Sequence, residues 1–172
     1  MGNITVIGRD DASELYQKQS KSQNNTGLVT VALGDLYPTN TGNISTFEAD
    51  RIFFAFGDDG KYASGYLYSS WTGYNTPANT VILPTTFKVQ ETTGYDITGL
   101  TVSVPSSSST LTGKLPKEWK NVFLVVSDGT GFTSGATLYT GTASGASWIW
   151  TGIDLDNGQY FSFATQIPPA PG

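Results

Sequence analysis

The strongest constraint on the fold is the recurrence of short segments in which apolar and polar residues alternate. Residues 86–91 are the clearest case, because the apolar Phe87 and Val89 alternate there with the polar Lys88 and Gln90. Successive side chains of a β-strand point to opposite faces, so this period predicts a strand with one buried face. We predict that residues 86–91 form a central strand. A second alternating run at residues 97–105 suggests that the two pair as a hairpin.

Similar segments separated by turn residues recur along the whole chain. An apolar run at residues 51–56 is expected in the middle of a sheet, and Asp156-Asn157-Gly158 is a hairpin signal between strands at 147–153 and 160–164. Residues 12–21 fit edge or irregular structure, with one or two helical turns as the alternative. Further strands are expected at residues 28–34 and 122–126, and a loop at 35–46.

About nine or ten short strands with almost no helix predict an all-β fold, a two-sheet antiparallel β-sandwich of the immunoglobulin-like or jelly-roll-like kind. Aromatic residues make up 13% of the chain. Trp148 with Trp150 and Phe161 with Phe163 each share one face of an expected strand, and such pairs would supply much of the core.

The 172 residues suit one domain, which we place at residues 1–167. Residues 168–172, Pro-Pro-Ala-Pro-Gly, have the composition of a linker to a following domain. Met1-Gly2 has the look of an expression start. We therefore expect the chain to be a domain taken from a longer protein.

Four segments together resemble an uncharacterised β-sandwich domain that recurs in large, multidomain cell-surface proteins of bacteria with type IX secretion. These segments are residues 7–22, 47–60, 83–94 and 157–165, and the Gln-Lys-Gln-Ser-Lys-Ser run at 17–22 is the most specific. The resemblance implies an adhesin-like architecture in a secreted, cell-surface protein. It supplies no catalytic residues to carry over.

The absence of His and Cys removes most catalytic and metal chemistry from consideration. A Ser-His-Asp triad, a Cys-His pair, a zinc site built on His or Cys and a disulfide framework are all excluded. Carboxylate pairs such as Glu91 with Asp96 or Asp154 with Asp156 remain, because glycosidases need only two acids. Because the chain has 14 acidic residues, such pairs carry little information about function. We therefore expect that the protein is not an enzyme.

Charge and hydropathy restrict the partners. A net charge of -5 with nine basic residues argues against nucleic acid as a partner. No apolar run approaches the 18 or more residues of a membrane-spanning helix, so we expect no membrane insertion.

Several expected strands end in aspartates, and some of these ends should meet at one rim of a sandwich. Calcium takes six to eight oxygen ligands, which carboxylates and turn carbonyls can supply. We therefore name Asp58, Asp59, Asp154 and Asp156 as candidate calcium ligands. The alternative is that these aspartates merely form turns.

Residues 70–79 show no periodicity and carry aromatic side chains that we cannot assign to the core. Trp71 and Tyr74 can stack on a sugar ring, and Asn75 can bond its hydroxyls. The alternative is that these aromatics cover one end of the sandwich.

We therefore expect a non-catalytic structural or adhesive module, a spacer or stalk domain in a large secreted bacterial surface protein. Its expected location is extracellular, at the cell surface. The expected partners are neighbouring domains of the same polypeptide and surface glycans. The alternative is a carbohydrate-binding module, with or without a bound calcium ion.

Overall fold

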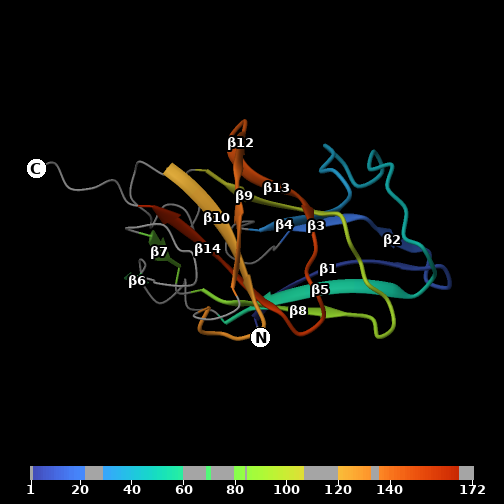
Figure 1. Ribbon diagram of the computed structural model, residues 1–172. Helices are drawn as coiled ribbons and strands as arrows, with labels where there is room; N and C mark the ends of the chain where they lie inside the picture. The colour runs from blue at the N-terminus through green and yellow to red at the C-terminus, as the bar shows by residue number, and fades with distance from the viewer. Residues whose placement is uncertain are drawn as a thin grey trace, which may run out of the picture.

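The computed structural model describes residues 2–21, 29–59, 69–70, 80–83, 85–106, 120–132 and 136–166. These residues form two antiparallel sheets packed face to face as a β-sandwich, which confirms the all-β fold (Figure 1). No helix occurs among them, and fourteen strands are present where the sequence predicts nine or ten. The additional strands are mostly pieces of two to four residues.

We call the larger sheet sheet A. In spatial order its main path is β11 (Thr137–Thr140), β10 (Lys120–Ser127), β14 (Tyr160–Gln166), β8 (Phe87–Glu91), β5 (Ile52–Asp58), β1 (Gly2–Asp10) and β2 (Leu15–Gln17). Two short strands extend it, because β7 (Thr80–Ile82) pairs with β14 and with β6 (Ser69–Ser70).

We call the smaller sheet sheet B. Its order is β12 (Thr142–Ser144), β13 (Ser147–Ile153), β9 (Leu100–Pro105), β4 (Thr30–Leu33) and β3 (Gln19–Lys21). The central strand predicted at residues 86–91 and the strand predicted at 51–56 are confirmed as β8 and β5, neighbours within sheet A. The loop expected at residues 35–46 contains no strand.

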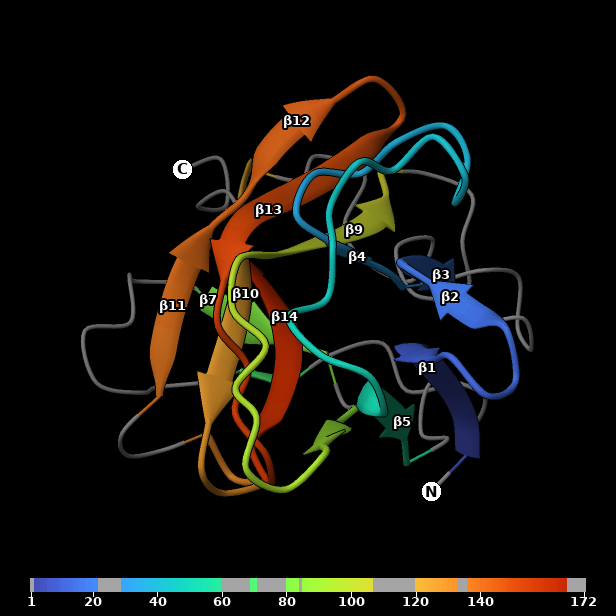
Figure 2. The same ribbon diagram turned by 90° about the vertical axis from the view of Figure 1, so that its right-hand side faces the viewer.

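On two sides of the sandwich, a segment at the edge of one sheet crosses to the edge of the other. β2 ends sheet A, and after the single residue Lys18 the chain continues as β3 at the edge of sheet B. β11 leads in the same way through Gly141 into β12 (Figure 2). Residues 12–21 therefore form edge structure, as the polar sequence indicates. The edge strands β2, β3, β11 and β12 each pair with a single neighbour, so both crossings lie at the edges of the two sheets.

Glycine is required at the second crossing because Trp150 lies directly beneath it. A Cβ atom on residue 141 would come within 2.9 Å of the indole ring and 3.1 Å of the Val122 carbonyl oxygen. The backbone amide of Gly141 donates to that carbonyl at 2.8 Å. The indole Nε1 of Trp150 donates to the Tyr139 carbonyl at 2.7 Å. The ring therefore joins the crossing to the core.

The core contains a group of packed phenylalanine rings on the inner face of sheet A. Phe87 and Phe161 are register partners on β8 and β14 and stack with their centroids 4.8 Å apart. Phe56 on β5 packs edge-on against both rings, at 5.9 and 5.4 Å. Across the sandwich, Trp150 of sheet B lies 5.4 Å from Phe163. All five side chains are at most 2% exposed, so this group binds the two sheets together.

The loop after β4 is held by polar side chains from the first crossing. Asn43 is fully buried, and its side-chain amide donates to the carbonyl oxygens of Leu33 at 3.0 Å and Asp35 at 3.3 Å. The ammonium of Lys18 donates to the Asn43 carbonyl at 2.5 Å. Lys18, the middle residue of the Gln-Lys-Gln run at 17–19, therefore has a structural role.

Two hairpins expected from the sequence are wrong. β8 pairs with β5 and β14 in sheet A, whereas β9 pairs with β13 and β4 in sheet B, so residues 92–99 cross between the sheets. The turn at residues 156–158 likewise joins β13 of sheet B to β14 of sheet A. Each strand has a single apolar face, and such faces can meet across the core as readily as side by side in one sheet. A turn signal does not distinguish the two arrangements.

Replacing Phe161 with alanine should lower the free energy of unfolding by about 3–5 kcal/mol, because it removes a fully buried ring that contacts three others. Urea unfolding measures this loss. Ile44, which is 79% exposed, provides the control, and Ile44→Ala should change stability by less than about 0.5 kcal/mol. Equal effects of the two substitutions would contradict the packing.

Candidate functional site

Four carboxyl groups gather at one end of the sandwich. Glu91 ends β8, Asp96 lies in the crossing from β8 to β9, and Asp154 and Asp156 lie between β13 and β14. The carboxylate oxygens of Glu91, Asp96 and Asp156 lie within 4.8 Å of one another. Asp154 interacts with Asp96 and Asp156. We call these four residues the acidic cluster.

Strand periodicity places each acid. Glu91 follows Phe87 and Val89 on the inner face of β8, where it is half-buried. In β13 the register shifts between Trp150 and Ile153, and Gly152 has a φ of 66°. This bulge returns Ile153 to the core.

Beyond the bulge, burial continues to alternate. Leu155 is buried, at 1% exposure, whereas its neighbours Asp154 and Asp156 are exposed. Two apolar residues thus anchor a segment whose two acids face solvent.

Hydrogen bonds fix the segments that carry the acids. The Ile97 amide donates to Glu91 Oε1 at 3.0 Å, and the Glu91 amide donates to Asn157 Oδ1 at 3.0 Å. The Gly158 amide donates to the Val89 carbonyl at 3.0 Å. The Asp156 amide donates to Gln159 Oε1 at 2.9 Å. The turn and the end of β8 therefore form one unit.

Electrostatics at the acidic cluster are unfavourable. Burial raises the pKa of Glu91, and the negative charges of Asp96 and Asp156 raise it further. The pKa of Asp154 is raised first by burial and then by the charges of the same two aspartates. Among the described residues the ion pairs are Arg9 with Asp11 and Arg51 with Asp50, so no described arginine or lysine pairs with the cluster.

A divalent cation is the chemical group best matched to these side chains. Calcium prefers carboxylate and carbonyl oxygens, and three carboxylates within 4.8 Å can each supply one ligand atom. An ion would also offset the repulsion that raises the pKa of Glu91 and of Asp154. Exposed acidic groups also occur without a bound ion.

The four aspartates named from the sequence fall into two places. Asp154 and Asp156 lie in the acidic cluster. Asp58 is the register partner of Phe87, whereas Glu91 is opposite Phe54, so Asp58 lies four residues along β8 from the cluster, about 13 Å away. Asp59 follows Asp58 at that same distant end, where its carboxylate accepts a hydrogen bond from the Thr86 amide at 3.1 Å.

Glu91 and Asp96 lie outside the set of calcium ligands predicted from the sequence, which pairs them instead as possible catalytic acids. The alternation along β8 could have placed Glu91, because an acid at the next inward position after Phe87 and Val89 lies at the rim of the core.

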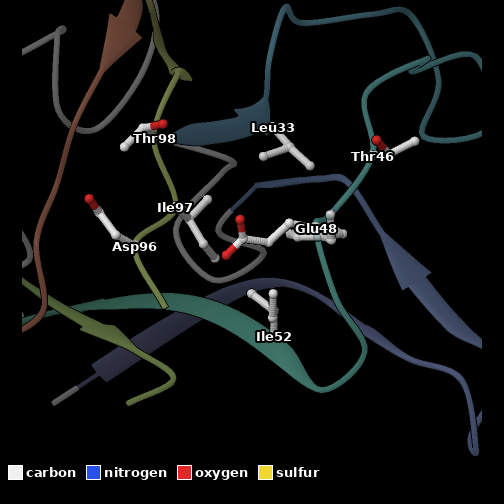
Figure 3. A pocket seen from close by; sticks show the side chains of 8 residues that line it. Leu33, Thr46, Glu48, Ile52, Asp96, Ile97 and Thr98 are labelled. Atoms are coloured by element: carbon white, nitrogen blue, oxygen red, sulfur yellow. The ribbon is translucent and has the colours of Figure 1, made fainter. Parts of the chain in front are cut away.

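A small pocket adjoins the cluster at Asp96. It has a volume of about 150 Å³ and an apolar floor that includes Leu33, Ile52 and Ile97. Figure 3 shows the Glu48 side chain reaching toward Ile97, whereas the Asp96 side chain points away from these apolar residues. Small-molecule sites usually measure about 300–1,000 Å³, so this pocket suits water or an ion better than a sugar ring.

The sugar-contact residues Trp71, Tyr74 and Asn75 lie outside the described residues, as does the linker at 168–172. Within the described ranges, no helix is long and apolar enough to cross a membrane.

Comparison with known families gives one match. Residues 1–159 match the family described as "Domain of unknown function (DUF8202)". The chain belongs to this family. No curated protein and no solved structure matches it. Membership in DUF8202 therefore agrees with a resemblance to an uncharacterised domain, and it assigns no activity to the acidic cluster.

The raised pKa values predict an unusual pH dependence. Glu91 and Asp154 hold protons more tightly when folded than when unfolded, so the stability they contribute is present below their ordinary pKa of about 4 and is lost as pH rises through the raised folded values. In metal-free buffer, Asp154→Asn should therefore stabilise the protein at pH 7 by up to about 1 kcal/mol and have little effect near pH 3.

Thermal unfolding at both pH values measures this effect, and 1 kcal/mol corresponds to roughly 2–4 °C for a chain of this size. Asp35, an exposed aspartate outside the cluster, supplies the control. A loss of stability at pH 7 in Asp154→Asn alone would show that the Asp154 carboxylate is stabilising there.

Proposed function

We propose that this domain is a non-catalytic structural or adhesive module of a large secreted bacterial surface protein. It acts at the cell surface as a spacer or stalk domain and is joined to neighbouring domains of the same polypeptide. The resemblance of residues 7–22, 47–60, 83–94 and 157–165 to such modules is one support. The main support comes from the geometry of the sandwich.

The observation that carries this proposal is the position of the first and last described strands in chain order, β1 and β14. β1 starts at Gly2, opposite Asp58, and β14 finishes at Gln166, opposite Thr80. The acidic cluster lies at the other end of β8, where Glu91 is opposite Phe54. Figure 1 shows the start of β1 beside the tip of β5, and β14 finishing toward the left of the view. Domains attached through β1 and β14 would leave the acidic end facing away from them.

The construction of the sandwich also suits a mechanical role. One apolar cluster extends through both sheets, and the crossings at Lys18 and Gly141 join the sheets through the chain itself. A single packed core shared by both sheets gives the rigid body that a spacer or stalk domain requires.

Labelling of intact cells tests the proposal. An antibody against the purified domain should bind intact cells that produce the parent protein, and external protease should remove the signal. A cytoplasmic protein labelled in parallel controls for lysis. Signal that appears only after the cells are broken would overturn the surface location.

The alternative function is a carbohydrate-binding module that depends on calcium, and the acidic cluster is the observation that favours it. Three carboxylates within 4.8 Å at the free end of the domain would hold an ion where a glycan can reach it. Such an ion can order a binding surface, and it can also bind sugar hydroxyls directly.

Calcium added to the metal-free protein should raise its melting temperature if this alternative holds, because a ligand that binds only the folded state stabilises it, by about 2.7 kcal/mol at 100 times the dissociation constant. Glu91→Gln should abolish the increase and Asp35→Asn should leave it unchanged. Identical melting temperatures in calcium and in chelator would exclude the alternative and leave the structural module intact.

A further inference from the structure

A groove on the outer face of sheet B supports an inference that is independent of the acidic cluster. It lies between β3 and residues 36–40 and has a volume of about 460 Å³. This volume is within the range of about 300–1,000 Å³ that is usual for small-molecule sites. We call it the polar groove.

Strand pairing shows which side chains form its floor. Val31 and Leu33 of β4 point into the core, so Thr30 points to the outer face of sheet B. Lys21 is the register partner of Thr30 and Gln19 is the partner of Ala32. Directly opposed residues of antiparallel strands share a face, so Gln19, Lys21 and Thr30 lie together on the outer side.

Hydrogen bonds hold the wall of the groove against this floor. The Gln19 side chain donates to the Tyr37 carbonyl at 2.7 Å and accepts from the Tyr37 amide at 3.2 Å. Asn40 Oδ1 accepts from the Lys18 amide at 2.6 Å, and its Nδ2 donates to the Tyr16 carbonyl at 3.0 Å. The groove is therefore formed before any ligand arrives, which lowers the entropy cost of binding.

Other polar groups that line the groove remain unused. The Lys21 ammonium and the hydroxyl groups of Thr30 and Tyr37 make no hydrogen bond or ion pair with the residues that the structure describes. Lys21 is the single charged residue in the lining, and Leu36 and Pro38 add apolar surface. The lining thus combines one cation, free hydroxyls and small apolar patches.

We propose that the polar groove binds an acidic saccharide, with the carboxylate of the sugar on Lys21 and its ring hydroxyls on Thr30 and Tyr37. The apolar patches match the C–H faces of a pyranose ring, and the lone ammonium selects a ligand with one negative charge. This binding activity goes beyond the structural role proposed above. It uses none of the residues named from the sequence as sugar contacts.

A titration of the ¹⁵N-labelled protein followed by amide chemical shifts tests this site. Glucuronate should shift the amides of residues 17–21, 30 and 36–40 in a saturable manner. Glucose should bind more weakly, and acetate should give no saturable shift at these positions. Lys21→Gln should weaken glucuronate binding about tenfold, because it removes a charge-assisted hydrogen bond.

Lys88→Gln is the matched control, since Lys88 lies on sheet A over the ring of Tyr160 at 5.5 Å. Its removal deletes the same charge and should leave glucuronate binding unchanged. Tyr37→Phe keeps the ring and should weaken binding severalfold, and an otherwise unchanged spectrum shows that the variant is folded.

Three results would overturn the proposal: equal affinity for glucose and glucuronate, saturable acetate binding as tight as that of glucuronate, and no saturable shift at the groove amides. None of them bears on whether the domain lies at the cell surface, so a failure here is separable from a failure of the proposed function.

Discussion

The stacked pair formed by Phe87 and Phe161 is the contact on which the rest of the structure depends. It joins β8 to β14 at a fixed register, and Phe56 brings β5 into the same group of rings. A slip of one residue in β8 would turn Lys88 and Gln90 into the core, at a large cost in burying polar groups. The aromatic packing therefore fixes the position of Glu91, four residues further along β8, and with it the acidic end.

The two ends of the sandwich differ chemically. At one end, burial and then the charges of Asp96 and Asp156 raise the pKa of Glu91 and of Asp154, and no described basic side chain forms an ion pair with the acidic cluster. The first and last described strands reach the other end: β1 begins there opposite Asp58, and β14 finishes there opposite Thr80. A module held through that side would present the acidic end and the outer faces of both sheets to its surroundings, which is compatible with the surface role proposed above.

The sequence predicts the strands better than it predicts their partners. β8 and β5 carry their own patterns of apolar residues, so their positions and central location could be predicted locally. Pairing could not, because Trp150 and Phe163 meet across the core with the same apolar faces that a hairpin would also present. The sequence predicts Asp154 and Asp156 as acids at strand ends and pairs Glu91 with Asp96, but that these two pairs meet depends on the contact between residues 92–99 and the turn before β14, which no local pattern reveals. The polar groove likewise depends on long-range bonds from Gln19 and Asn40.

Hydrogen exchange of individual backbone amides tests the central role of the aromatic packing most directly. If the stacked rings hold the domain together, the amides in the ladders that join β5, β8 and β14 should exchange only through global unfolding. The edge strands β2 and β12 should open at lower free energy. Exchange of the β8 amides as rapid as that of the edge strands would contradict the account. It would show that the aromatic packing does not hold β8 in the register that places Glu91 in the acidic cluster.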